Sequence, residues 1–125
     1  TIYTERFMRT PQENPEGYDL APEFMDGVRL ERDQNEAFKG ADFIYAKNWS
    51  SYTSYGEILS TDPAWTVSSD KMALTNNAKF MHCLPVRRNV VVNDDVIDSE
   101  NSIIISQAAN RVTSAQLVIK RILEG

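Results

Sequence analysis

Short apolar runs alternate with helix-type segments along this chain, and this alternation constrains the fold more than any other feature. The runs occupy residues 42–46, 79–84 and 102–105, and each has the length of a buried strand. Strand-like segments also occur at residues 1–4 and 28–31. Strands separated by helices favour a parallel sheet with helices on its faces. The sequence therefore predicts an α/β fold, a Rossmann-like parallel sheet with flanking helices.

Helix start and stop signals place the predicted helices between these runs. Asp33, followed three residues later by Glu36, resembles a capping box, and Gly40 is a natural end for the helix it opens. A long loop is expected at residues 47–62, where polar and aromatic residues follow no clear period. Three further helices are expected, at residues 22–27, 68–74 and 111–123.

Composition and charge exclude several classes of protein. The net charge of −5 argues against a nucleic-acid binder, which normally carries a basic surface. No apolar run is long enough to cross a bilayer, and we find no signal-peptide pattern. Cys83 is the single cysteine and His82 the single histidine, so neither an internal disulfide nor a His/Cys metal cluster can form. We therefore expect a cytoplasmic protein in a reducing compartment, with no nucleic-acid or membrane partner and no metal.

Cationic residues and the cysteine follow two of the predicted strands. Lys47 comes directly after one run, and Cys83, Arg87 and Arg88 end or follow another. In parallel sheets, ligands bind beyond the carboxyl ends of the strands, and arginines there can hold a carboxylate or phosphate by paired hydrogen bonds. The alternative is a buried, inert cysteine beside a loop lysine and a solvated charged turn.

Asn110 and Arg111 open the last predicted helix. A cation in the first turn of a helix is unfavourable because it faces the positive end of the helix dipole. Both that dipole and Arg111 would favour an anion at this position, so we take Arg111 as a further candidate for ligand binding. A capping asparagine next to an exposed arginine is the alternative.

Taken together, these residues form a recognisable signature. Their order and spacing over about residues 79–123, and more weakly over residues 41–45, resemble the carboxy-terminal part of the ornithine carbamoyltransferases. The residues that carry the resemblance are His82-Cys83-Leu84-Pro85, Arg88, Asp94-Asp95-Val96-Ile97-Asp98-Ser99 and Ala109-Asn110-Arg111.

The resemblance implies transfer of a carbamoyl group from carbamoyl phosphate to a primary amine, without a metal or organic cofactor. It implies that Cys83 and the backbone of Leu84 lie beside the carbamoyl group and the attacking amine, and that Arg111 contacts carbamoyl phosphate. Catalysis would then consist of positioning and of charge stabilisation in an oxyanion-bearing intermediate. The resemblance also implies a homotrimer with active sites at the subunit borders.

Two departures from the ordinary ornithine enzymes bear on the substrate. Those enzymes carry an aspartate two residues before the loop tryptophan, followed by a Ser-Met-Gly segment, whereas this chain has Lys47 before Trp49 and no Ser-Met-Gly. A lysine repels the α-ammonium of free ornithine but suits the α-carboxylate of an N-acylated ornithine. Arg87 stands where the ordinary enzymes have an uncharged residue. Both replacements resemble the N-acetylornithine and N-succinylornithine carbamoyltransferases, and the extra cations favour the succinyl substrate.

The phosphate-binding Ser-Thr-Arg-Thr-type and His-Pro-x-Gln-type motifs of the family do not occur in these 125 residues. We therefore expect residues 1–125 to be part of a carboxy-terminal, ornithine-derivative-binding domain, without the amino-terminal carbamoyl-phosphate domain and inactive alone. Three alternatives stay open at this point: an N-acetylornithine enzyme, an ordinary ornithine enzyme with a variant loop, and a stand-alone, non-catalytic binding module.

Overall fold

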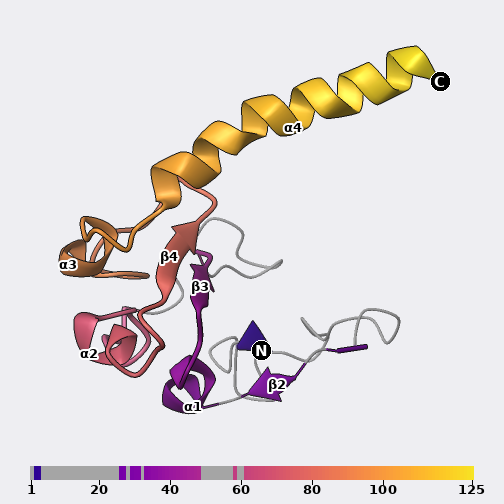
Figure 1. Ribbon diagram of the computed structural model, residues 1–125. Coiled ribbons are helices and arrows are strands. Elements are labelled where there is room, and N and C mark those ends of the chain that lie inside the picture. Colours follow the sequence, from indigo (N-terminus) through magenta and orange to yellow (C-terminus); the bar gives the residue numbers. More distant parts are fainter. Residues whose placement is uncertain (1, 4–25, 28, 32, 49–57, 59–60) are drawn as a thin grey trace.

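The computed structural model describes residues 2–3, 26–27, 29–31, 33–48, 58 and 61–125. Within these residues the strands form two parallel pairs (Figure 1). Strand β1 (Ile2–Tyr3) pairs with β2 (Leu30–Glu31), and β3 (Phe43–Ala46) pairs with β4 (Lys79–His82). The predicted parallel α/β architecture is confirmed. Most of the helix expected at residues 22–27 lies outside the described residues.

Three short helices connect and cover the strands, and a long one ends the chain. They are α1 (Gln34–Phe38), α2 (Ser69–Met72), α3 (Asp94–Ile97) and α4 (Ile104–Glu124). Asp33 caps α1 as expected, because its carboxylate accepts hydrogen bonds from the backbone N–H groups of Asn35 and Glu36. Gly40 follows α1 with a φ of 66°, which suits glycine at a helix end.

The hydrophobic core lies between the β3–β4 pair, α1 and α3. Phe80, at the centre of β4, is fully buried, and Ile44 packs from β3. The other members are spread between residues 38 and 104 and are Phe38, Val67, Ala78, Val92, Val96, Ile97 and Ile104. Burying these side chains is the main favourable term for this part of the fold.

Lys71 fastens α2 to the segment before it and to α1. Its ammonium donates hydrogen bonds to the carbonyl oxygens of Ala64 and Thr66, at 2.5 and 2.8 Å, and to the side-chain oxygen of Gln34. All three donors of the ammonium are thereby used. Burial lowers the pKa of Lys71, since a low dielectric disfavours the charged form.

Two of the predicted strands need correction. Residues 102–105 do not form a third strand: Ser102 makes a single bridge to Phe80, and the chain then turns into α4 at Ile104. A short apolar run fits either a strand or a buried helical turn, and here helix formers follow it. The predicted strand at residues 42–46 is buried on one face only, since Phe43 is 63% and Tyr45 53% exposed.

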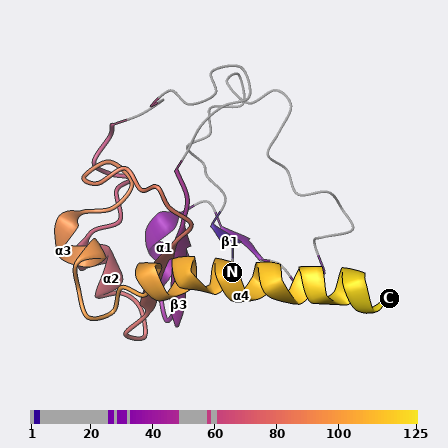
Figure 2. The same ribbon diagram turned by 90° about the horizontal axis from the view of Figure 1, so that it is seen from above.

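The last helix begins seven residues before its predicted start at residue 111. Arg111 therefore lies in the third turn of α4 rather than the first, and the argument from the helix dipole does not apply to it. Figures 1 and 2 show α4, which follows α3 in the chain, beginning near the end of β4 and extending beyond the sheet. Every residue from 109 to 124 is exposed, including the apolar face that the sequence indicates, on which Val112 and Ile122 are 63% and 73% exposed.

Candidate functional site

The two segments with candidate binding residues leave the sheet side by side. Ala46 is paired with His82 at the carboxyl ends of β3 and β4. Lys47 and Cys83 are the next residues on the two strands, so their backbones enter the same edge of the sheet. The structure therefore places the backbones of Lys47 and Cys83 next to each other at the ends of β3 and β4. Trp49 and the residues up to Tyr52 lie outside the described part of the chain.

Helix α4 places two polar side chains against the end of β4. The Nη2 atom of Arg111 donates a hydrogen bond to the backbone carbonyl oxygen of Cys83 at 2.5 Å. The side-chain oxygen of Gln107 accepts a hydrogen bond from the backbone N–H of His82 at 2.9 Å. Residues four apart lie on one face of a helix, so a single face of α4 contacts two consecutive residues of the strand end. The structure thus brings Arg111 to the backbone of Cys83.

Leu84 adopts an unusual backbone conformation that its neighbour stabilises. Its φ is 52°, in the left-handed region that residues with a Cβ rarely adopt. Its backbone N–H donates a hydrogen bond to Nδ1 of His82 at 2.9 Å, and the Leu84–Pro85 peptide bond is cis. The hydrogen bond to His82 therefore supports a φ at Leu84 that few residues adopt.

His82 is fully buried, and its Nε2 atom finds no hydrogen-bond partner among the described residues. Because Nδ1 accepts the Leu84 N–H, the neutral ring carries its proton on Nε2. Burial lowers the pKa of His82, which favours this neutral form. His82 is thus a buried, neutral histidine whose ring contacts the backbone of Leu84.

Asn48 and Tyr45 also belong to this rim, although sequence reasoning assigned neither of them a role. The side chain of Asn48 contacts the backbone of Pro85 and Arg87. The pKa of Tyr45 is raised by burial and by the neighbouring Cys83. The sequence signal for Tyr45 was its position two residues before Lys47 in a strand whose side chains alternate between faces.

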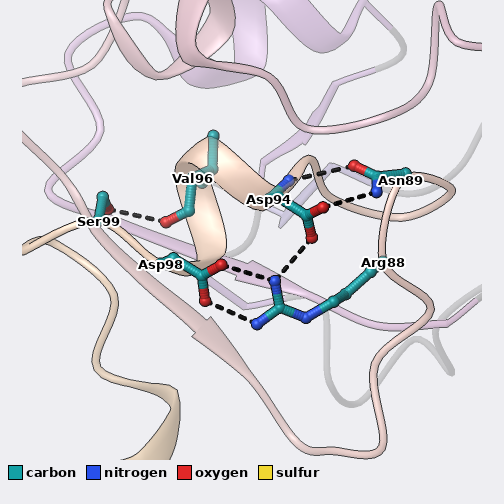
Figure 3. Close-up of polar contacts among 6 residues, drawn as sticks. All are labelled: Arg88, Asn89, Asp94, Val96, Asp98 and Ser99. Atoms are coloured by element: carbon teal, nitrogen blue, oxygen red, sulfur yellow. Dashed lines mark hydrogen bonds and ion pairs between the residues drawn. The ribbon is translucent and has the colours of Figure 1, made fainter.

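Arg88, expected to bind a substrate anion, contacts two aspartates of this chain. Its guanidinium donates to the carboxylates of Asp94, at 2.6 Å, and Asp98, at 2.6 and 2.7 Å (Figure 3). These aspartates stand at the first residue and at the C-cap of α3. Asn89 adds two hydrogen bonds with Asp94. Three of the five N–H donors of Arg88 are thus used by two carboxylates, and these contacts favour a structural role for Arg88.

Acidic residues stand at the start of α3. Asp94 and Asp95 lie in the first turn of α3, where acidic side chains are favourable. Among the described residues, no three His, Cys, Asp or Glu side chains are grouped so that they could hold a metal ion. None of the described helices, α4 included, combines the length and apolar character that crossing a membrane requires.

Comparison with known proteins gives one consistent family. The family model for the Asp/Orn binding domain of aspartate/ornithine carbamoyltransferases matches residues 9–122. The N-succinylornithine carbamoyltransferase of Bacteroides thetaiotaomicron is 62% identical over 114 residues, which cover 90% of this chain and 36% of that protein. The N-acetylornithine carbamoyltransferase of Xanthomonas campestris is 38% identical over 117 residues, covering 89% of this chain and 33% of that protein.

A solved structure agrees with the sequence comparisons. A mutant N-acetyl-L-ornithine transcarbamylase, complexed with carbamyl phosphate and N-succinyl-L-norvaline, aligns with a TM-score of 0.59 and 40% identity. The alignment covers 75% of this chain and 33% of that one. This chain therefore spans about a third of the length of the relatives that it matches.

Proposed function

Since this chain belongs to the aspartate/ornithine carbamoyltransferase family, we propose that it forms the amino-acid-binding part of an enzyme that carbamoylates the side-chain amine of an N-acylated ornithine. The favoured substrate is N-succinyl-L-ornithine, in arginine biosynthesis, and the donor is carbamoyl phosphate. The relative with 62% identity is an N-succinylornithine carbamoyltransferase, which supports the choice of the succinyl substrate over the acetyl one.

The contact between Arg111 and Cys83 is the observation that carries the proposal. A guanidinium has five N–H donors, so one bond to the Cys83 carbonyl leaves donors for an oxygen of carbamoyl phosphate. Cys83 and Leu84 follow directly in the chain. Arg111, Cys83 and Leu84 are therefore proposed as the residues that surround the reacting groups.

The reaction requires no group beyond the two substrates. The amine nitrogen attacks the carbonyl carbon of carbamoyl phosphate, the bond from that carbon to the phosphate oxygen breaks, and inorganic phosphate leaves. The nitrogen loses a proton to solvent or phosphate. Hydrogen-bond donors aimed at the carbonyl and phosphate oxygens stabilise the charge that develops there, and Arg111 is one such donor.

Lys47 and Arg87 are proposed to recognise the anionic parts of the acylated substrate. Both follow strand ends on the rim that carries Cys83. Lys47 would repel the α-ammonium of free ornithine. An N-acylated ornithine lacks that charge, so Lys47 can bind its α-carboxylate without this repulsion. The distal carboxylate of a succinyl group gives Arg87 a second partner of the geometry that a guanidinium prefers. Arg88 is proposed as a structural support for this segment, through α3.

The remainder of the subunit is proposed to supply the phosphate-binding residues, and the enzyme is proposed to be a cytoplasmic homotrimer. The test is steady-state kinetics of the complete subunit with carbamoyl phosphate and, in turn, ornithine, N-acetylornithine and N-succinylornithine. We expect the highest kcat/KM with N-succinylornithine. A preference for free ornithine would indicate the ordinary enzyme with a variant loop, and binding without turnover would indicate a non-catalytic module.

A further inference from the structure

The side chain of Asn48 links the two segments of the candidate site. Its Nδ2 atom donates a hydrogen bond to the carbonyl oxygen of Pro85 at 2.8 Å. Its Oδ1 atom accepts a hydrogen bond from the backbone N–H of Arg87 at 3.3 Å. The backbone pairing of β3 with β4 ends at Ala46 and His82. Beyond that point, the Asn48 amide continues the ladder between the two segments.

An amide is well suited to this contact. A carbonyl oxygen needs a donor and a backbone N–H needs an acceptor, and the asparagine side chain presents both on one planar group. Alanine offers neither. Leucine has nearly the shape of asparagine but no polar atom, so it would leave the Arg87 N–H and the Pro85 carbonyl oxygen without this partner.

The residues next to this contact are the two cations proposed to bind the substrate. Lys47 precedes Asn48 in the chain, and Arg87 supplies the N–H that Asn48 accepts. We propose that Asn48 is a positioning residue. Its side chain holds the backbone next to Lys47 against the backbone of Arg87, so that the two cations keep a fixed spacing when they bind the acylated substrate. This inference rests on the proposed function for its ligand but not for its contacts.

The expected effect is on substrate affinity. Without the link, the two segments move independently, and their ordering on binding opposes association because each immobilised side chain and loop loses conformational freedom. The carbamoyl group and its phosphate are proposed to contact Arg111, which α4 positions independently of Asn48. Loss of the link should therefore raise the KM for the amine substrate and leave the KM for carbamoyl phosphate unchanged.

The test compares Asn48→Ala and Asn48→Leu with Asn76→Ala in the complete subunit. Asn76 is a matched control, because its amide also links two segments, through a 2.8 Å bond to Asp42, but at the other end of the strands. We expect both Asn48 variants to raise the KM for N-succinylornithine about tenfold, the effect of one or two lost hydrogen bonds, with kcat within about twofold of wild type. Asn76→Ala should keep the wild-type KM.

Hydrogen–deuterium exchange supplies a readout that does not depend on activity. The backbone N–H of Arg87 should exchange faster in both Asn48 variants, whereas peptides covering residues 96–104 of the core should exchange as in wild type. Unchanged exchange at Arg87, or a fall in kcat with an unchanged KM for N-succinylornithine, would overturn the positioning role. If the wild-type subunit turns over no ornithine derivative, the proposed function fails, and the exchange experiment still decides whether Asn48 holds the two segments together.

Discussion

Gln107 accepts a hydrogen bond from the backbone N–H of His82 through its side-chain oxygen, at 2.9 Å. This bond and the one from Arg111 to Cys83 join α4 to the last residue of β4 and to the residue after it. The strand end that carries the candidate site is thus held by a helix that begins twenty-two residues further along the chain, since β4 ends at residue 82 and α4 begins at residue 104. The stability of this end of the sheet should depend on that one helical face.

Replacing Gln107 by leucine tests this dependence. The His82 backbone N–H would lose its acceptor in a part-buried position, and an unsatisfied group of this kind costs about 1–3 kcal/mol. We expect a loss of unfolding free energy of that size, measured by urea unfolding. Gln116→Leu, on an exposed position of the same helix, is the control and should change the free energy by about 0.5 kcal/mol or less. Equal effects of the two substitutions would count against the role of Gln107.

His82 should make the protein sensitive to mild acid. Burial lowers its pKa in the folded state, so the unfolded chain binds more protons between that lowered pKa and the ordinary value of about 6.5. The unfolding free energy should fall as the pH drops below about 6.5, until the pH has passed the pKa of the folded state. Protonation would also remove the Nδ1 acceptor from the Leu84 N–H. Since His82 is the single histidine, the unfolding free energy of the His82→Asn variant should change little between pH 5 and pH 7.

The ion pairs of Arg88 with Asp94 and Asp98 should be lost at a pH lower than the one at which His82 is protonated, because they persist until the two carboxylates take up protons. Hydrogen bonds from Asn89 and Arg88 lower the pKa of Asp94, and those from Arg88 lower the pKa of Asp98. A lowered carboxyl pKa contributes stability above the ordinary value of about 3.9, and this contribution disappears as the pH falls through the lowered value. Arg88→Gln should therefore lower the melting temperature at pH 7 and less so below pH 3. Arg121→Gln, on the exposed part of α4, should show no such dependence on pH.

Local signals in the sequence predicted the elements whose cause is local. The Asp33 cap, the glycine after α1 and the short helix near Ser68 depend on neighbouring residues, and all three were placed to within a residue or two. The start of α4 was missed because the apolar run at residues 102–105 is equally compatible with a strand. That choice is decided by Ile104, which packs into the core from the first turn of the helix.

In the candidate site, too, features that depend on local sequence could be predicted and features that depend on distant contacts could not. Cys83, Lys47 and Arg111 could be proposed from their positions after strands or from the family signature. The contacts of Arg88 could not, because they depend on where α3 stands relative to a turn six to ten residues earlier. Asn48 and Gln107 were missed because each binds backbone atoms more than twenty residues away, and backbone partners leave no trace in the sequence.

The 125-residue chain on its own should give no carbamoylated product. It spans about a third of its relatives, and the phosphate-binding residues are proposed to lie in the remainder. The purified chain is incubated with carbamoyl phosphate and each of the three ornithine derivatives, and product is measured by mass spectrometry. Turnover by the isolated chain would contradict the division of labour proposed between the two parts of the subunit.

Substrate choice in the complete subunit should depend on Lys47 and Arg87. Free ornithine presents an α-ammonium near Lys47, and a like-charge pair in a partly desolvated site disfavours binding. Acylation removes that charge and leaves the α-carboxylate for Lys47. We therefore expect Lys47→Asp to raise the KM for N-succinylornithine at least about tenfold, the factor that corresponds to about 1.4 kcal/mol. Lys39→Asp, which makes the same charge change at the end of α1, is the control and should leave that KM unaltered.

Arg87→Ala distinguishes the two carboxylates of the substrate. If Arg87 binds the distal carboxylate of the succinyl group, the variant should lose more kcat/KM on N-succinylornithine than on N-acetylornithine, because only the succinyl substrate carries that group. Equal losses on the two substrates would assign Arg87 to the α-carboxylate, which both share. The backbone of Arg87 is held by Asn48 in either case, so the two outcomes differ only in where the guanidinium points. Steady-state kinetics with both substrates decides between them.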